Sequence, residues 1–486
     1  TDIENLDFTS LKGSASSSFN LKLDKTLKIK KNKFDISASV DDLQANFKKK
    51  INGKFLSEDL KNIHLKEATI QINIEDDKSI TKFKSKIKTS NEYFNVDISK
   101  KMPENSTNFS ITGKSPIKIP VINYSYENDQ LNLTGRYYEN NKNLIFSKIN
   151  YEVDDNIFKI ENLVLNKELD LINFDKLSVI SKLNGKINNN FIIKNSDKNK
   201  INIKGSIFDA KLLVKEFSNK SENNFFKNIS KDIEIDLDKI LTDTDFPLNK
   251  FRLIGNIKKG KFEKISGKSE FIDNRYLDIS LKREKDTNFK ILEIHSDVAR
   301  PLLNSYKFFD GLNKGNLIFE SRFDDKNSIS TLRVNNFKIV NAPAFATLLS
   351  LADFKGLTDS LKGEGISFDT LVIKYNTDPK IMRIEEIFMI GPSISILIEG
   401  YVEKESDLIS LRGTLVPAKT LNTLLSKIPL VGHILIGKKD GEGLFGVSFK
   451  IKGLPDQLKT TVNPVKSLTP RFITRALESI KKKQSK

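Results

Sequence analysis

The sequence predicts an all-β protein with a few short helices, whose strands follow one another as an antiparallel meander. The first observation is the alternation of apolar and polar residues in short runs, which is the period of a half-buried strand. In the clearest run, the apolar positions are Ala68, Ile70, Ile72 and Ile74. The second observation is that polar turns, such as residues 75–78 and 139–142, separate the runs. The third is that only 38% of residues are apolar, which suits strands with one apolar face.

Similar alternating runs fill the first half of the chain. They occupy residues 19–23, 34–40, 149–153, 201–203 and 233–237. Short strands joined by turns at regular spacing favour an antiparallel meander over βαβ units. Residues 217–232 are rich in Asn, Ser and Lys, a composition that predicts a polar loop. We therefore divide the chain into residues 1–216, the loop 217–232 and a C-terminal region 233–486.

Two short helices interrupt the strands of the C-terminal region. One is predicted within residues 300–312, and the longest helix of the chain is predicted within residues 341–354, with Asn341 as its cap and Pro343 in its first turn. The apolar stripe of this second helix is Phe345, Leu348, Leu349 and Ala352. Such a stripe either covers the end of a sheet or contacts lipid, and helical stripes mostly face a core. Strands are predicted at residues 315–323, 366–375, 381–389 and 393–402.

Residues 411–477 combine a strand, two amphipathic segments and several turns. A strand is predicted to break at Pro417, and a short helix follows as far as Pro429. A strand at 444–452 places Phe445, Val447 and Phe449 on one face, and Asn463-Pro464 predicts a turn. The last helix begins at Pro470, and its apolar and basic residues include Phe472, Ile473, Leu477, Arg471 and Arg475. A basic amphipathic helix lies on an anionic membrane surface or packs on the sheet, and the sequence leaves both open.

The sequence offers no catalytic, cofactor-binding or metal-binding residues. The chain has no cysteine, which excludes disulfides and thiolate metal sites. The three histidines, His64, His295 and His433, lack the spacing of metal ligands. The glycine-rich segment 437–443 has the wrong order of residues for a phosphate-binding loop and precedes a strand. We therefore expect that the protein is not an enzyme.

The net charge of +17 has two interpretations. It can attract anionic lipid headgroups or nucleic acid. It can also reflect the composition of an AT-rich genome, since Lys, Asn and Ile are all abundant and the lysines are spread through the strands. No nucleic-acid-binding motif accompanies the charge, and we expect no nucleic-acid partner.

Several long, ordered motifs resemble the AsmA-like proteins of Gram-negative envelopes, specifically the YhdP-like branch. They are GTLVPAKTLN (413–422), IPLVGHILIG (428–437), GEGLFGVSF (441–449), VNPVKSLTP (462–470), VNNFKIVNAPAFATLLSLADFKGLTDSLKGEGISFD (334–369), GSIFDAKLL (205–213) and SDVARPLL (296–303). The resemblance is specific in the second half of the chain, and the first half is similar only in its general pattern of residues.

The resemblance implies an elongated, curled antiparallel β-sheet that forms an open hydrophobic groove. A compact sandwich would show the same alternation, so the groove is implied by the family alone. The resemblance further implies a periplasmic protein that carries phospholipid between inner and outer membrane surfaces. An N-terminal helix absent from this sequence would anchor it in the inner membrane. The alternative is a scaffold or assembly factor for outer-membrane proteins, similar to TamB, whose sheet edge pairs with client strands.

Two sets of residues are the candidates for lipid and membrane contact under this interpretation. The groove candidates are Ile70, Ile72, Ile74, Phe445, Val447 and Phe449. The membrane-contact candidates are the five residues named above in the last helix.

Overall fold

The structure is a computed structural model in which the chain forms two compact units. It describes residues 8–51, 59–76, 78–89, 92–104, 106–114, 131–139, 143–153, 156–167, 169–197, 199–210, 229–242, 246–303, 311–340, 343–351, 357, 360–361, 363–417, 446–455 and 457–465. The first unit comprises residues 1–241 and 256–262, and the second comprises residues 242–255 and 263–486. The described residues form 26 strands and few helices, which confirms the predicted all-β fold.

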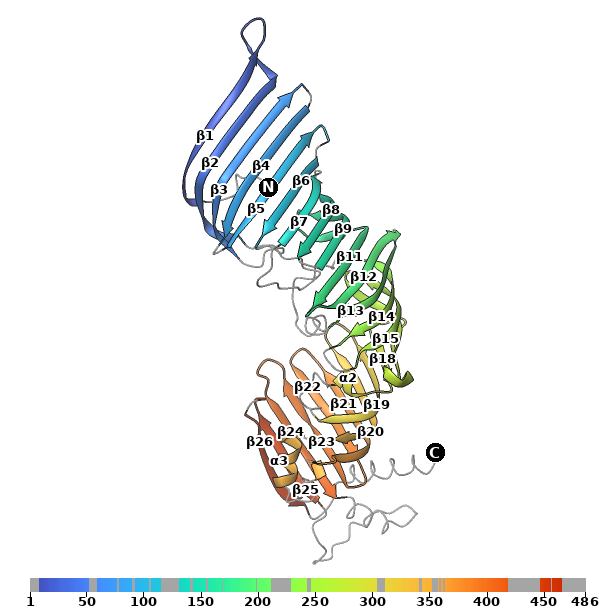
Figure 1. Ribbon diagram of the computed structural model, residues 1–486. Helices are drawn as coiled ribbons and strands as arrows, with labels where there is room; N and C mark the ends of the chain where they lie inside the picture. Colours follow the sequence, from blue (N-terminus) through green and yellow to red (C-terminus); the bar gives the residue numbers. More distant parts are fainter. Residues whose placement is uncertain are drawn as a thin grey trace, which may run out of the picture. The chain divides into compact units, whose positions relative to one another are not determined.

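The first unit is an open, curled sheet of sequential strands (Figure 1). Its strands are β1 (Phe8–Leu23), β2 (Ile29–Ile51), β3 (Leu60–Glu75), β4 (Lys78–Thr89), β5 (Glu92–Met102), β6 (Ser106–Gly113), β7 (Leu131–Glu139), β8 (Asn143–Val153), β9 (Asn156–Asn166), β10 (Leu171–Asn173), β11 (Lys176–Leu183), β12 (Lys186–Asp197), β13 (Lys200–Asp209) and β14 (Lys231–Leu241).

The second unit adds further strands and the described helices. Its elements are β15 (Leu248–Lys258) and β16 (Lys261–Glu270), each with a few residues counted in the first unit, η2 (Ile272–Asn274), β17 (Tyr276–Arg283), β18 (Lys290–Ser296), α2 (Arg300–Leu303), β19 (Leu312–Phe323), β20 (Ser328–Ile339), α3 (Pro343–Leu351), β21 (Ile366–Thr377), β22 (Ile381–Ile390), β23 (Ile394–Glu403), β24 (Ile409–Pro417), β25 (Gly446–Gly453) and β26 (Lys459–Val465).

Nearly all described strand pairs are antiparallel and join neighbours in the sequence. In the first unit β9 pairs with both β10 and β11, and every other antiparallel pair joins consecutive strands. The exception to the antiparallel prediction is β13, which pairs with β14 in parallel. A parallel pair needs a crossover rather than a hairpin, and residues 210–230 between these strands supply the length. The predicted loop 217–232 lies mostly outside the described residues, and its last two residues belong to β14.

The second unit has a packed core beneath α3. Its most enclosed side chains, each 0% exposed, include Val334, Leu349, Leu361, Ile394 and Leu415. The α3 residues Phe345, Leu348 and Leu349 pack in this core, so the apolar stripe covers a sheet, and α3 is the longest helix among the described residues. Asn341 and Ala352 lie outside the described residues.

The prediction of a turn at Asn463-Pro464 is wrong. Both residues lie inside β26, where Asn463 is opposite Ser448 and Pro464 is opposite Val447. Among the described strands, β26 pairs with β25 alone, so it is an edge strand. An edge strand tolerates proline because the missing N–H can be placed on the unpaired side.

Phenylalanine rings cover glycines at two matching places in the sheet, and a third glycine also pairs with a phenylalanine. One pair is Gly135 opposite Phe109, and the other is Gly413 opposite Phe449. In each pair the glycine leaves space that the phenylalanine ring fills. A Cβ on either glycine would lie 2.4 Å from the ring carbon Cζ. Gly205 is likewise opposite Phe191, and a Cβ there would lie 2.5 Å from the phenylalanine Cβ. An aromatic ring over a glycine compensates for the packing that the glycine lacks.

Candidate functional site

The candidate site is the apolar face of the first unit, which we define by the side of the sheet that carries Ile70. In β3 the side chains of Ile70, Ile72 and Ile74 are half-buried, whereas Gln71 and Asn73 between them are exposed. The alternation seen in the sequence therefore separates an apolar face from a polar face. All three isoleucine candidates lie together on the apolar face.

An unbroken row of directly paired residues crosses this face from β2 to β14. Each member lies opposite the next on the neighbouring strand, so their side chains are cross-strand neighbours on one face. The row is Ala38, Ile70, Phe83, Ile98, Phe109, Gly135, Ile149, Ile160, Leu177, Ile193, Ile203 and Ile235. Its one glycine lies under the ring of Phe109. We call this the central row.

A second row runs beside the central row from β4 to β14. It consists of Ser85, Val96, Ile111, Leu133, Tyr151, Phe158, Val179, Phe191, Gly205 and Leu237. Ser85 and Tyr151 are the members of this row whose side chains carry a polar group, and Tyr151 is largely aromatic. Together the two rows form an apolar band that is continuous across these strands.

The apolar face is most accessible on β1, and its exposure varies across the other strands. On β1, Phe19 is 69% exposed and Leu21 is 38% exposed. Ile98 and Ile149 are half-buried, and Phe158 and Val179 are each 1% exposed. Accessibility is therefore greatest at the β1 edge, whereas an enclosed side chain already occurs on β5, where Val96 is 8% exposed.

A β-bulge at Glu67 keeps the apolar face continuous along β3. Leu65 pairs with Ile87 and Ile70 pairs with Phe83, and the register shifts between these pairs. Glu67 itself has a φ of 52°, and the bulge adds one residue to β3. Strict alternation would place Leu65 and Ile70 on opposite faces. The bulge returns both to the apolar face.

Polar side chains bound the apolar band on β11 and β12. Next to Val179 and Phe191, the same face carries Ser181 and Asn189, which are 0% and 9% exposed. Asn189 Nδ2 donates to Ser181 Oγ at 3.0 Å, and Asn189 Oδ1 accepts from the backbone N–H of Asp209 at 2.8 Å. Buried polar groups that are hydrogen-bonded in this way cost little. The apolar band therefore ends on β11 and β12 at buried polar side chains whose hydrogen-bonding groups have partners within the protein.

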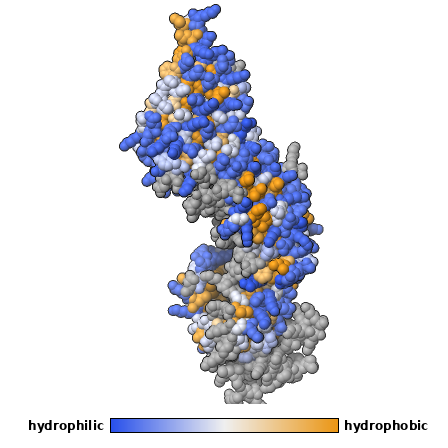
Figure 2. All heavy atoms as spheres, viewed as in Figure 1, coloured by the Kyte–Doolittle hydropathy of each residue, from blue (hydrophilic) through white to orange (hydrophobic). Residues whose placement is uncertain are grey.

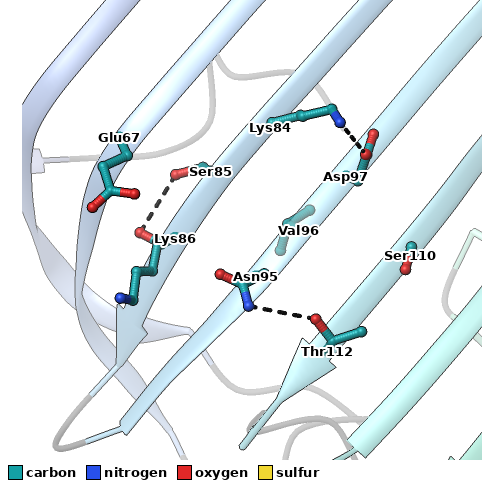
Figure 3. Close-up of a pocket in the computed structure, with 9 residues that line it drawn as sticks. All are labelled: Glu67, Lys84, Ser85, Lys86, Asn95, Val96, Asp97, Ser110 and Thr112. Atoms are coloured by element: carbon teal, nitrogen blue, oxygen red, sulfur yellow. Dashed lines mark hydrogen bonds and ion pairs between the residues drawn. The ribbon is translucent and has the colours of Figure 1, made fainter.

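The polar face of the same strands carries lysines and a small hollow. The Nζ atoms of Lys66, Lys86 and Lys88 lie 5.6, 5.5 and 5.2 Å from the centre of the Tyr93 ring, which is the range of a cation–π contact. Beside this cluster lies a hollow of about 250 Å³. Figure 3 shows the residues that line it, among them Lys84, which forms an ion pair with Asp97 at 3.0 Å. The lining of the hollow is mostly polar-face residues, together with Ser85 and Val96 of the second row: Glu67, Lys84, Ser85, Lys86, Asn95, Val96, Asp97, Ser110 and Thr112. Such a polar lining does not suit an acyl chain.

Burial perturbs one lysine of the first unit. Lys231, at the start of β14, contacts Asn195 Oδ1, and burial lowers the pKa of its ammonium group, partly offset by Asp175. This lysine lies outside both apolar rows. The described residues of the rows carry no titratable group other than the Tyr151 phenol.

The remaining groove candidates lie in the second unit. Val447 is half-buried, and Phe449 is 2% exposed within the packed core that contains Leu349. The structure therefore encloses Phe449 within the core of the second unit itself. Phe445 and the membrane-contact candidates Phe472, Ile473, Leu477, Arg471 and Arg475 lie outside the described residues.

Most members of the central row were not singled out from the sequence. Phe83 and Ile98 lie in runs where lysines or polar residues occupy alternate positions, so the signal of period two was present. The sequence alone could not show that these residues are opposite Ile70 and Phe109, because pairing depends on register.

Comparison with known proteins leaves the chain without a match: no family model, curated protein or solved structure is similar to it. Among the helices that the structure describes, none has the length and apolarity needed to cross a bilayer. Within the same described residues, no three or more acidic, histidine or cysteine side chains group as metal ligands would.

Proposed function

We propose that the protein carries phospholipid along the apolar face of the first unit, which serves as a hydrophobic groove. The observation that carries this proposal is the unbroken apolar band from β2 to β14 on a sheet that remains open. A band of this kind can accept acyl chains along its length while the headgroup stays in water. The transport itself needs no catalytic residue.

Transfer energies explain why such a band is useful. Burial of one methylene group is worth ~0.8 kcal/mol, so moving two acyl chains through water costs on the order of 20 kcal/mol. A surface that contacts the chains at every step removes most of that barrier. Half-buried side chains such as Ile70 and Ile98 offer contact without being enclosed in a closed core.

The proposed setting follows from the resemblance to AsmA-like, YhdP-like proteins. In that setting the protein lies in the periplasm of a Gram-negative envelope, and its partners are phospholipid and the inner and outer membrane surfaces. Residues 1–216 supply the groove repeats, and residues 233–486 form the AsmA-like C-terminal region. An N-terminal helix would hold the protein at the inner membrane.

One observation favours a scaffold of the TamB kind as the second candidate function. Among the described strands β1 pairs with β2 alone, and its residues Leu11 and Phe19 are 60% and 69% exposed. Such an edge can receive a client strand by β-augmentation. In that case the client would be an outer-membrane protein, and lipid would have no required place on the apolar face.

Photo-crosslinking on the two faces of β3 tests the proposal. A crosslinker at Ile70 or Ile72 should capture phospholipid from the cell envelope, and the matched positions Gln71 and Asn73 on the polar face should not. The lipid would be identified by mass spectrometry of the crosslinked product. Capture from the polar face alone would contradict a groove on the apolar face. Capture of protein from β1 positions, without lipid at Ile70 or Ile72, would favour the scaffold.

A further inference from the structure

The β1–β2 hairpin ends in apolar side chains that project into solvent. Leu27 at its turn is 79% exposed, and Leu23 and Ile29, which face each other across the hairpin, are 50% and 53% exposed. Figure 2 shows hydrophobic and hydrophilic side chains adjoining each other at this tip. Three large aliphatic side chains at one tip form an unusually apolar end for a hairpin, because turns normally carry polar residues.

The turn is held in a defined shape by Asp24. Its Oδ1 accepts hydrogen bonds from the backbone N–H of Thr26 at 2.8 Å, the hydroxyl of Thr26 at 2.7 Å and the backbone N–H of Lys28 at 2.9 Å. The backbone N–H of Leu27 donates to the Asp24 carbonyl at 3.0 Å. Leu27 has a φ of 60°, a conformation that favours glycine or asparagine and that leucine rarely adopts. The turn therefore presents a leucine where a polar residue or glycine would fit more easily.

The hairpin extends beyond the neighbouring strand. The last residue of β3, Glu75, is opposite Lys33, so residues 22–32 have no β3 partner beside them. The register shifts between the pairs Leu21–Phe34 and Leu23–Ile29, so the tip begins beyond an irregularity in the hairpin. The exposed apolar residues Phe19 and Leu21 of β1 lie directly before this tip.

Lysines surround the apolar tip. Between Leu21 and Lys33 the sequence has lysines at positions 22, 25, 28, 30, 31 and 33 and a single acidic residue, Asp24. Lys22, Lys25, Lys28 and Lys30 are exposed, and Asp24 is occupied by the turn. An apolar tip within a ring of lysines is complementary to a bilayer with anionic headgroups, since the apolar residues enter the acyl boundary and the lysines meet the headgroups.

We propose that the tip of the β1–β2 hairpin inserts into the surface of an anionic phospholipid bilayer. The anchors are Leu23, Leu27 and Ile29, and the exposed lysines supply the preference for anionic lipid. The purpose of docking rests on the proposed function: it would bring the accessible β1 edge of the apolar face to the lipid. Docking itself is measured without any transfer assay.

A tryptophan reporter tests insertion directly, because the chain contains no tryptophan. In the Leu27→Trp variant, vesicles of phosphatidylcholine and phosphatidylglycerol should shift the emission to shorter wavelength, and bromine-labelled acyl chains should quench it. Phosphatidylcholine vesicles alone should give a much weaker response. The matched control is Ile329→Trp, at a residue of the second unit that is 60% exposed, and its emission should not change.

Substitutions at the tip should weaken vesicle binding in a co-sedimentation assay. We expect Leu27→Ser to lower the affinity about tenfold, from the apolar contact that it removes. Lys25→Gln and Lys28→Gln should each lower it about fivefold and reduce its dependence on salt. Lys82→Gln, at an exposed lysine on the polar face of β4, is the control and should bind as the unmodified chain does. All these side chains are exposed, so the variants should keep their β-sheet circular dichroism and thermal midpoint.

Three outcomes would overturn the proposal. The first is an unchanged tryptophan emission of the Leu27→Trp variant under conditions where the protein binds vesicles. The second is an equally large emission shift with vesicles of phosphatidylcholine alone, because it would show that the tip does not require an anionic surface. The third is an emission shift that grows with protein concentration in the absence of vesicles. It would show that the tip binds a second copy of the chain and not a bilayer. None of these outcomes decides whether lipid moves along the apolar band, which the crosslinks at Ile70 and Ile72 test separately.

Discussion

The two units use the same alternation of residues for opposite purposes. In the first unit, the apolar face near β3 remains half-buried, and Ile70 and Ile72 keep contact with solvent. In the second unit, the same kind of face is covered by α3, and Leu349 and Val334 are 0% exposed. The difference lies in what covers the sheet, since the strands themselves follow one pattern. Substitutions of the same chemical kind should therefore have different consequences in the two units.

The largest difference is expected for a carboxylate placed on each apolar face. Leu349→Asp buries an unpaired charge and should destabilise the second unit by more than about 3 kcal/mol. Ile72→Asp keeps its carboxylate partly hydrated and should cost about 1 kcal/mol, while it impairs phospholipid transfer between donor and acceptor vesicles. Chemical denaturation and the transfer assay measure the two effects, with Gln71→Asp as the control on the polar face. Equal destabilisation by both aspartates would mean that the two faces are equally enclosed.

A smaller difference is expected for the two glycines that lie under phenylalanine rings. Gly413→Ala forces the ring of Phe449 to move within a packed core, and overpacking of a core costs typically about 1–3 kcal/mol. Gly135→Ala displaces the ring of Phe109, which is half-buried on the apolar face and can move more easily than a ring enclosed in a packed core. We expect the first variant to lower the free energy of unfolding by about 2 kcal/mol and the second by about 1 kcal/mol. A reversed order would show that the core of the second unit is the more adaptable one.

The smallest effect concerns an ion-pair network in the second unit. Glu263 accepts from Lys290 and Arg283, each at 2.8 Å, and these hydrogen bonds hold the pKa of its carboxyl below the ordinary value of 4.5. A lowered pKa stabilises the fold above the ordinary value, and the contribution is lost as the pH falls through the lowered pKa. Glu263→Gln should therefore cost about 1 kcal/mol at neutral pH and progressively less as the pH falls below about 4.5. Denaturation curves across this range test it.

The control for this network is an exposed pair on neighbouring strands. Lys282 and Glu293 lie 3.3 Å apart with side chains 65% and 35% exposed. Exposed pairs contribute little, so Glu293→Gln should leave the stability and its pH dependence nearly unchanged. A pH dependence in Glu263→Gln equal to that of the unmodified chain would contradict the role given to Glu263.

The alternation of apolar residues was enough to predict the fold class and the faces of individual strands. Ile70, Ile72 and Ile74 lie together as expected because a strand has a side-chain period of two. The pattern could not predict the bulge at Glu67, since an added residue has no distinct composition. Nor could it predict the parallel pairing of β13 with β14, because the direction of a strand depends on the connection before it.

The candidate site was predictable only in part. Ile72 and Phe449 have the same alternating neighbours in sequence, yet one is half-buried and the other is enclosed in a core. What distinguishes them is a helix distant in sequence that packs on the sheet of the second unit. Local pattern contains no information on such a cover, and this is why it could identify an apolar face but not an accessible one.

The phenylalanine rings over glycines also bear on how these strands find their partners. A sheet of many similar alternating strands is prone to slippage, because several alignments place apolar residues together. A phenylalanine opposite a glycine is a bulky group opposite an empty position, and a slip along the strand would drive the ring of Phe109 or Phe449 against a side chain instead. The pairs Phe109–Gly135, Phe191–Gly205 and Phe449–Gly413 thus mark the correct alignment at three separated points. During folding, each would reject misaligned neighbours where the alternation alone cannot tell them apart.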